Sequence, residues 1–195
     1  MNGKRQFLTA TTLAMLGGSV TAANSRASGA LGPGLLTVTG QVSMVNRGPL
    51  DKALDQMMVK QQQSFERAHV FDFGALTRLP ARTIRPTLEY DAKVHALQGP
   101  LLTDVLRAAG APESPATSLA LRAIDGYTIQ ITLDEVRRRN FIVATHLDGK
   151  PMPLGGLGPL WAVLDADRIP ELAGKPLPER FAQCPWGLYH IVVGA

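Results

Sequence analysis

The stretch Leu97-Gln98-Gly99-Pro100-Leu101-Leu102-Thr103-Asp104-Val105-Leu106-Arg107-Ala108-Ala109-Gly110-Ala111 predicts one short helix with both ends visible in the sequence. Pro100 suits the first helical position, because its missing N–H would have no partner there. Gly110 is expected to end the helix in the left-handed conformation, and Pro112 stops any continuation. The apolar residues recur at helical spacing and predict one buried face, made of Leu101, Leu102, Val105, Leu106 and Ala109.

Length and composition favour one well-buried core. The chain has 195 residues, of which 45% are hydrophobic and 18% are charged. Its formal net charge of +4 is small and does not favour nucleic-acid binding. Arg137-Arg138-Arg139 is the compact basic run, and we interpret it as the solvated end of a helix, where cations are favourable. Cys184 is the single cysteine, which excludes an intramolecular disulfide. The histidines show no ligand-like spacing, so the sequence does not support a zinc site made by sequence-adjacent ligands.

Residues 1 to 28 resemble an export signal. Lys4-Arg5 precedes an apolar run from Leu8 to Val20, and small residues follow at positions 22, 23 and 27. The pattern is similar to a twin-arginine signal with lysine in place of the first arginine, although a Sec signal or an uncleaved anchor has a similar pattern. We therefore expect a periplasmic protein with one domain over residues 29–195, in contact with the membrane only if the signal is uncleaved.

The remaining chain predicts a mixed α+β fold, a mixed β-sheet with short packed helices. Alternating or β-branched runs predict strands at residues 35–42, 83–90, 141–146, 160–164 and 186–193. Asp125-Gly126 lies between two such runs and predicts a hairpin. Short helices are expected at three places: after Pro49, with an apolar face of Leu50, Ala53, Leu54, Met57 and Met58; from Asp72 to Leu79; and from a Thr132–Glu135 capping box to about Arg139. Residues 170–178 are expected to form a proline-rich loop.

Several short motifs in these segments occur in the same order as in a known protein family. The order comprises Phe73-x-x-Leu76-x-x-Leu79-Pro80, Gly99-Pro100-Leu101-Leu102-x-Asp104-Val105-Leu106, Asp125-Gly126-Tyr127-Thr128, Ala144-x-x-x-Asp148-Gly149, Gly158-Pro159-Leu160-Trp161 and Trp186-x-Leu188-x-x-Ile191. It is similar to the oxidoreductase molybdopterin-binding domain of the sulfite oxidase type, in its small single-domain bacterial form. The resemblance covers about residues 35 to 193. It implies a mixed α/β domain that holds molybdopterin, with molybdenum bound through the pterin dithiolene.

The sequence departs from that family where the metal is held. In catalytic members a cysteine thiolate ligates molybdenum, from a loop after the strand that corresponds to residues 83–88. This chain has no cysteine there, and Thr87 to Tyr90 run almost directly to Gly99-Pro100. Cys184 lies far along the chain and is expected to be a small buried thiol. Trp161 and Trp186 stand where larger members carry an arginine and a lysine, cations that suit a phosphate-bearing cofactor.

The resemblance and the local chemistry together predict a set of cofactor-binding residues and no metal-ligating residue. Glu89 and Asp91 lie near His95 and suggest acid–base chemistry, although a solvated loop has the same composition. Tyr127 follows a hairpin turn and His146 ends a buried strand, places where a side chain can reach a ligand. A half-buried aromatic ring and a structural histidine are the more common interpretations of the two. Gly155-Gly156-x-Gly158-Pro159 offers backbone N–H groups to an anion. The predicted set, from loops expected to share one rim, is Thr87, Glu89, His95, Asp125, Tyr127, His146, Gly158 and Trp161.

Two functions follow as expectations. The first is an exported molybdopterin-dependent oxidoreductase that transfers an oxygen atom or electrons at molybdenum if the cofactor is bound. It acts on a small-molecule substrate and needs an external redox partner, because the sequence has no haem or iron–sulfur motif. The alternative is a non-catalytic periplasmic ligand- or protein-binding module on the same fold, which binds through an exposed region at Trp161 or Trp186. An open polar groove would favour the cofactor, and a groove filled by tryptophan would favour the binding module.

Overall fold

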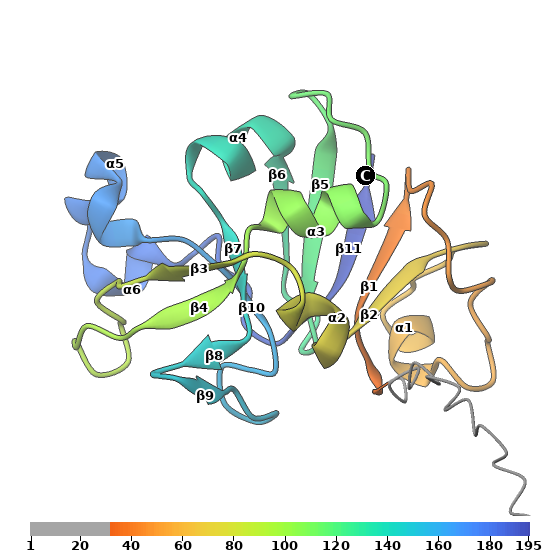
Figure 1. The fold of residues 1–195 in the computed structure, drawn as a ribbon, viewed down its shortest axis with the longest axis horizontal. Coiled ribbons are helices and arrows are strands. Elements are labelled where there is room, and N and C mark those ends of the chain that lie inside the picture. The colour runs from red at the N-terminus through yellow and green to blue at the C-terminus, as the bar shows by residue number, and fades with distance from the viewer. Residues whose placement is uncertain (1–31) are drawn as a thin grey trace, which may run out of the picture. The chain divides into compact units, whose positions relative to one another are not determined.

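The structure is a computed structural model that describes residues 32–195 (Figure 1). The predicted export signal lies outside the described residues. None of the helices in the described part has the length and apolar character that a membrane crossing requires. The described chain combines mixed sheets with a few short helices, which confirms the predicted α+β class.

The largest sheet has five strands in the order β2-β1-β11-β5-β6. Strand β1 (Gly34–Gly40) pairs in parallel with β11 (Leu188–Val193), which joins the two ends of the described chain. The other pairs are antiparallel: β2 (His69–Asp72) with β1, β5 (Ser118–Ala123) with β11, and β6 (Thr128–Thr132) with β5. The β5–β6 hairpin turns at Asp125-Gly126, where Gly126 has a φ of 93°, as the sequence predicted.

Two smaller sheets adjoin the large one. The first contains β3 (Ala81–Ile84), β4 (Leu97–Pro100), β8 (His146–Leu147) and β9 (Lys150–Pro151) in that order. The second pairs β7 (Ile142–Ala144) with β10 (Trp161–Val163), and all six of their residues are buried. The turn between β8 and β9 is the predicted Asp148-Gly149 pair, and both residues have a positive φ.

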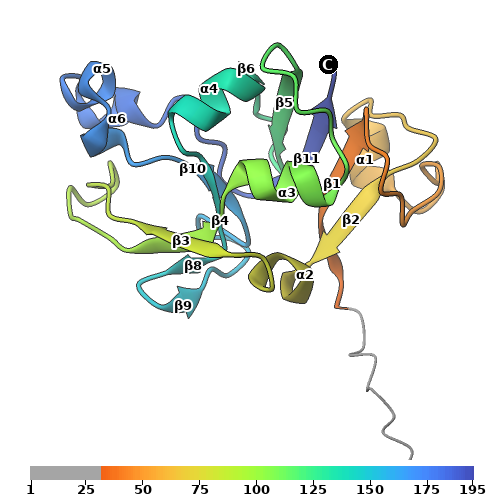
Figure 2. The same cartoon turned by 45° about the horizontal axis from the view of Figure 1, so that its top comes forward.

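The helices are short, and several are capped as predicted. Helix α2 (Phe73–Thr77) begins where the Asp72 carboxylate accepts a hydrogen bond from the Ala75 N–H at 2.6 Å. Helix α4 (Leu133–Arg138) begins with the Thr132–Glu135 capping box. Helix α3 (Leu102–Ala108) lies beside the five-stranded sheet, and α1 (Gln56–Lys60) lies near β1 and β2 (Figure 2). Helix α3 contributes to the same apolar core as that sheet, whereas α1 contributes Met58 to a second cluster.

The central stretch begins as a strand, so the prediction for Pro100 was wrong. Residues Leu97 to Pro100 form β4, in which Pro100 pairs opposite Ala81, and α3 starts at Leu102. Pairing with two neighbouring strands, which is not visible locally, decides this conformation. The helix itself is buried as predicted at Leu102, Val105, Leu106 and Ala109, and Gly110 has a φ of 71°.

Two further expectations were wrong. The segment after Pro49 forms only the five residues of α1, and Leu54 is 81% exposed, because the Asp51 carboxylate accepts hydrogen bonds from the N–H groups of Ala53 and Leu54 in a tight turn. Residues 170–178 are not a loop. They contain α5 (Pro170–Ala173) and the start of α6 (Leu177–Arg180), which follow the short 3-10 helix η1 (Ala166–Arg168). Pro170 occupies the first turn of α5, where proline is favourable.

The crossing of β4 and β7 generates a stability prediction. A Cβ at residue 99 would overlap the carbonyl oxygen of Val143, because the two backbones touch there. Replacing Gly99 with alanine should lower the free energy of unfolding by about 2 kcal/mol or more, since the strands must separate. Urea denaturation measures this. The matched control is Gly48→Ala, where an added Cβ meets nothing within 4 Å, and an equal loss in both variants would contradict the packing described.

Candidate functional site

A cavity of about 270 Å³ opens between the loop after β3, the β5–β6 turn and the segment from α6 to β11. We call it the aromatic cavity. The sequence placed Glu89, Asp125 and Tyr127 in one site, and the structure brings these three together here. The lining residues are Glu89, Tyr90, Ala123, Asp125, Tyr127, Pro178, Phe181, Ala182, Cys184, Pro185 and Trp186.

The hairpin turn fixes the position of Tyr127 at this cavity. The Asp125 carboxylate accepts a hydrogen bond from the Tyr127 N–H at 2.9 Å, as an Asx turn requires. The Tyr127 hydroxyl donates to the carbonyl oxygen of Ala182 at 2.5 Å, across the cavity. The N–H of Ile124 donates to the carbonyl oxygen of Gly187 at 3.0 Å, which ties the turn to the start of β11. The β5–β6 turn is therefore joined by hydrogen bonds to the segment from α6 to β11 on the other side of the cavity.

Exposed aromatic rings and carboxylates give this cavity its chemistry. Tyr90, Tyr127 and Trp186 are 56%, 49% and 37% exposed, and all three line it. Glu89 and Asp125 supply two carboxylates, and none of the lining residues is a lysine or arginine. Burial and the neighbouring Glu89 raise the pKa of Tyr90 to about 12, so its hydroxyl stays protonated. The cavity is therefore aromatic and electrically negative.

Trp161 lies behind the wall of the cavity and is fully buried. Its indole N–H donates to the carbonyl oxygen of Cys184 at 2.8 Å, and its ring centroid lies 5.9 Å from that of Phe181. An antiparallel bridge joins Trp161 to Trp186. The expectation that Trp161 forms part of an exposed binding region was wrong, because β10 turns this side chain into the core. Trp186 is the exposed tryptophan of the pair.

Cys184 is buried, as the sequence predicted, with 3% of its surface exposed. Burial raises the pKa of its thiol to about 12, an effect that a backbone hydrogen bond from Leu164 only partly offsets. The sulfur of the folded chain is therefore a buried, neutral thiol.

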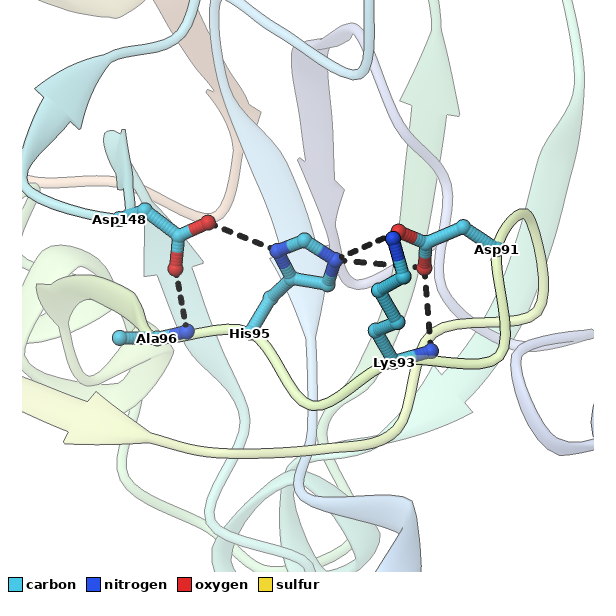
Figure 3. A network of polar contacts seen from close by, with 5 residues as sticks. All are labelled: Asp91, Lys93, His95, Ala96 and Asp148. Atoms are coloured by element: carbon cyan, nitrogen blue, oxygen red, sulfur yellow. Dashed lines mark hydrogen bonds and ion pairs between the residues drawn. The ribbon is translucent and has the colours of Figure 1, made fainter.

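His95 lies in a separate cluster, shown in Figure 3, between the carboxylates of Asp91 and Asp148. Nδ1 is 2.7 Å from Asp148 Oδ2, and Nε2 is 3.1 Å from Asp91 Oδ2. Asp148 Oδ1 accepts a hydrogen bond from the Ala96 N–H at 2.9 Å. These bonds raise the pKa of His95, chiefly through Asp148, and lower the pKa of each aspartate. We call this cluster the carboxylate clamp.

The carboxylate clamp joins the loop before β4 to the turn between β8 and β9. A carboxylate lies within hydrogen-bond distance of each ring nitrogen of His95, so the arrangement favours the protonated imidazole. We therefore interpret His95 as a link between two loops and not as a base that accepts a proton from a ligand. Sequence reasoning grouped His95 with Asp91 but missed Asp148, whose only local signal was the Asp-Gly turn.

The other predicted residues lie outside the lining of the aromatic cavity. The Thr87 N–H donates to Asp167 Oδ2 at 2.6 Å, so Thr87 ties its loop to η1. His146 Nδ1 lies 2.8 Å from the Thr145 hydroxyl, and its ring packs beside Phe73. Gly158 lies against Met152, with no room for a Cβ. The loop at 155–158 is therefore not part of this cavity's lining, although the sequence predicted a common rim.

The sequence predicted an exposed region at Trp186 but gave no prediction for the rest of this wall, which residues 178–185 form. Phe181 and Pro185 line the cavity from this segment, and both are buried. The available signal was a cluster of apolar residues after α6 in a region that otherwise reads as polar and proline-rich.

Comparisons with known proteins identify a shared fold. No family model matches the chain, and no curated protein matches it. The crystal structure of the sulfane dehydrogenase SoxCD from Paracoccus pantotrophus is similar, with a TM-score of 0.50 and 13% sequence identity. The match covers 81% of this chain and 37% of that chain, so this chain spans little more than a third of the chain that it resembles. At this identity the likeness shows the fold alone.

The residues of the aromatic cavity do not fit a molybdopterin. A phosphate-bearing cofactor favours arginine or lysine, whereas this cavity presents two carboxylates and no cation among its lining residues. Molybdenum favours an accessible soft thiolate, whereas the sulfur among these lining residues, that of Cys184, is buried in the apolar core. Within residues 32–195, no group of three or more His, Cys, Asp or Glu side chains is arranged to hold a metal ion.

The carboxylate clamp should make stability depend on pH. The pKa of His95 is raised above 6.5, so its contribution is complete below that pH and is lost as pH rises through the raised pKa. The pKa values of Asp91 and Asp148 are lowered below 3.8, so their contribution is complete above that pH and is lost as pH falls through the lowered values. The stability difference between the natural chain and His95→Gln should therefore be largest between about pH 4 and 6.5. Urea denaturation across pH measures it. Asp148→Asn should give the same profile, and a difference that does not vary between pH 5 and 9 would contradict the clamp.

The thiol of Cys184 should be unreactive in the folded chain. Iodoacetamide attacks the thiolate, and a buried thiol with a pKa of about 12 supplies almost none at pH 8. Mass spectrometry should show slow labelling in buffer and rapid labelling in denaturant. Rapid labelling of the folded chain would place the sulfur at the surface and contradict the structure.

Proposed function

We propose that the chain is a non-catalytic binding module that takes a small organic cation in the aromatic cavity. The observation that carries this proposal is the composition of the cavity wall. Three exposed rings and two carboxylates converge on it, without a lysine or arginine among the lining residues. The fold is shared with part of a sulfane dehydrogenase, and the ligand chemistry differs from that of a phosphate-bearing cofactor.

Aromatic rings and carboxylates act together on a cation. The faces of Trp186, Tyr90 and Tyr127 carry negative charge density, which attracts an ammonium group and is strongest for tryptophan. Glu89 or Asp125 neutralises the charge of a bound ligand. At about 270 Å³ the cavity is small for a binding site and suits a compact ligand such as a quaternary or primary amine.

The alternative function is that of an oxidoreductase with an external redox partner and molybdenum chemistry. The likeness to a sulfane dehydrogenase favours it. We rank it second because the cavity lacks an accessible thiolate and a cation for a phosphate. For either function, the pattern of residues 1 to 28 supports a periplasmic location.

Choline is a suitable probe for the aromatic cavity. Titration of the full chain with choline should change the tryptophan fluorescence saturably, because Trp186 is exposed at the cavity. Trp186→Leu and Asp125→Asn should each weaken binding by about tenfold, measured by calorimetry, since one removes the ring and the other the charge. Asparagine keeps a side-chain oxygen that can accept from the Tyr127 N–H, so the turn is preserved.

Two controls make this test specific. The neutral isostere 3,3-dimethylbutan-1-ol should not bind, because it has the shape of choline without the charge. Glu66→Gln removes an exposed carboxylate outside the cavity and should leave choline binding unchanged. Equal binding of the neutral isostere, or an equal loss in Glu66→Gln, would contradict the proposed cation site.

A further inference from the structure

A second cleft, lined by arginines, lies away from the aromatic cavity. Its volume is about 630 Å³, and it is lined by the end of β3 with the following residue, the C-terminal end of α4, and the segment that contains η1. We call it the arginine cleft. Its charged lining residues are Arg85, Arg138, Arg139, Arg168 and Asp165.

The positive charge of the arginine cleft is only partly balanced. Arg168 lies 3.5 Å from Asp165, and Arg138 lies 2.9 Å from Asp134, with both arginines more than half exposed. Exposed pairs of this kind are weak in water. Arg85 makes no ion pair with any residue in the described part of the chain. Four guanidinium groups therefore face a cleft that contains one carboxylate.

Arg139 is the buried member of this set. Its side chain is 17% exposed, and its guanidinium bonds to Gln183 Oε1 and lies 3.9 Å from Glu135. The Nε atom is buried and has no hydrogen-bond partner among residues 32–195. A buried donor without an acceptor is costly, and the Asp165 Oδ1 atom of the same cleft is likewise buried without a hydrogen-bond partner, so the polar groups around this cleft are incompletely paired within residues 32–195.

The arrangement is not explained by the end of a helix alone. The sequence suggested a solvated helix end for residues 137–139, where cations are favourable. The structure instead gathers arginines from positions 85, 138–139 and 168, which are far apart in the sequence. Helix α4 has six residues, and its end requires neither Arg85 nor Arg168. Gathering like charges is unfavourable in the absence of an anion.

We propose that the arginine cleft binds a soluble phosphorylated small molecule. Guanidinium groups match phosphate oxygens in a bidentate geometry, and several of them suit a ligand with more than one negative charge. Ile84 and Ile169 add apolar surface to the same cleft, and its volume exceeds that of a phosphate group alone. The ligand is therefore an organic phosphate. This site differs from the aromatic cavity in place and in charge, and so goes beyond the proposed function.

Pyrophosphate and adenosine monophosphate are the probes for this site. Calorimetry of the full chain at low salt should show one pyrophosphate site, and adenosine monophosphate should bind more tightly than inorganic phosphate. Arg85→Gln and Arg168→Gln should each weaken pyrophosphate binding by about tenfold, because each removes a charged donor. Both side chains are exposed, so the fold should survive, and circular dichroism checks this.

The controls distinguish specific binding in the arginine cleft from nonspecific electrostatic attraction to the protein surface. Arg67→Gln removes the same charge at an exposed position outside the cleft and should leave the affinity unchanged. No pyrophosphate binding, an equal loss in Arg67→Gln, or binding only to vesicles that contain phosphatidylglycerol would overturn the proposal. Pyrophosphate should also leave the affinity for choline unchanged, so failure at one site is distinguishable from failure at the other.

Discussion

The burial of Trp161 is the constraint on which the aromatic cavity depends. Strand β10 places the ring in the core, where its N–H donates a hydrogen bond to the carbonyl oxygen of Cys184 and the ring packs beside Phe181. The antiparallel β-bridge between Trp161 and Trp186 fixes the backbone position of Trp186, which lines the cavity. Removing a buried ring of this size typically costs about 3–5 kcal/mol, so the wall is held by a large packing energy. One wall of the cavity is therefore anchored to the core.

The chain separates its charges into two places. The aromatic cavity carries carboxylates, while the arginine cleft carries guanidinium groups. Gln183 connects them, because it bonds to Arg139 and is followed by Cys184 in the cavity wall. Each set of lining residues therefore carries charged side chains that are all, or nearly all, of one sign. The fold is shared with part of a sulfane dehydrogenase, and the two sites differ in charge and in the ligands that we propose for them.

Local signals in the sequence predicted local structure well. The Thr132 capping box and the Asp125 turn depend on residues a few positions apart, and both are confirmed. Pro100 was assigned to the wrong element because its conformation is decided by pairing with Ala81, a distant residue. The same limit applies to the sites. Glu89, Asp125 and Tyr127 could be proposed as a group through a resemblance, whereas the carboxylate clamp and the arginine cleft join segments that only the folded chain brings together.

The molybdenum content of the full chain, produced in a host that makes the molybdenum cofactor, tests the central claim most directly. The claim is that the aromatic cavity suits a small cation and does not suit a molybdopterin. Mass spectrometry of the metal in purified protein should find far less than one molybdenum per chain, with no change in Cys184→Ser. One molybdenum per chain that is lost in Cys184→Ser would contradict it, because the sulfur would then be a ligand and not a buried thiol.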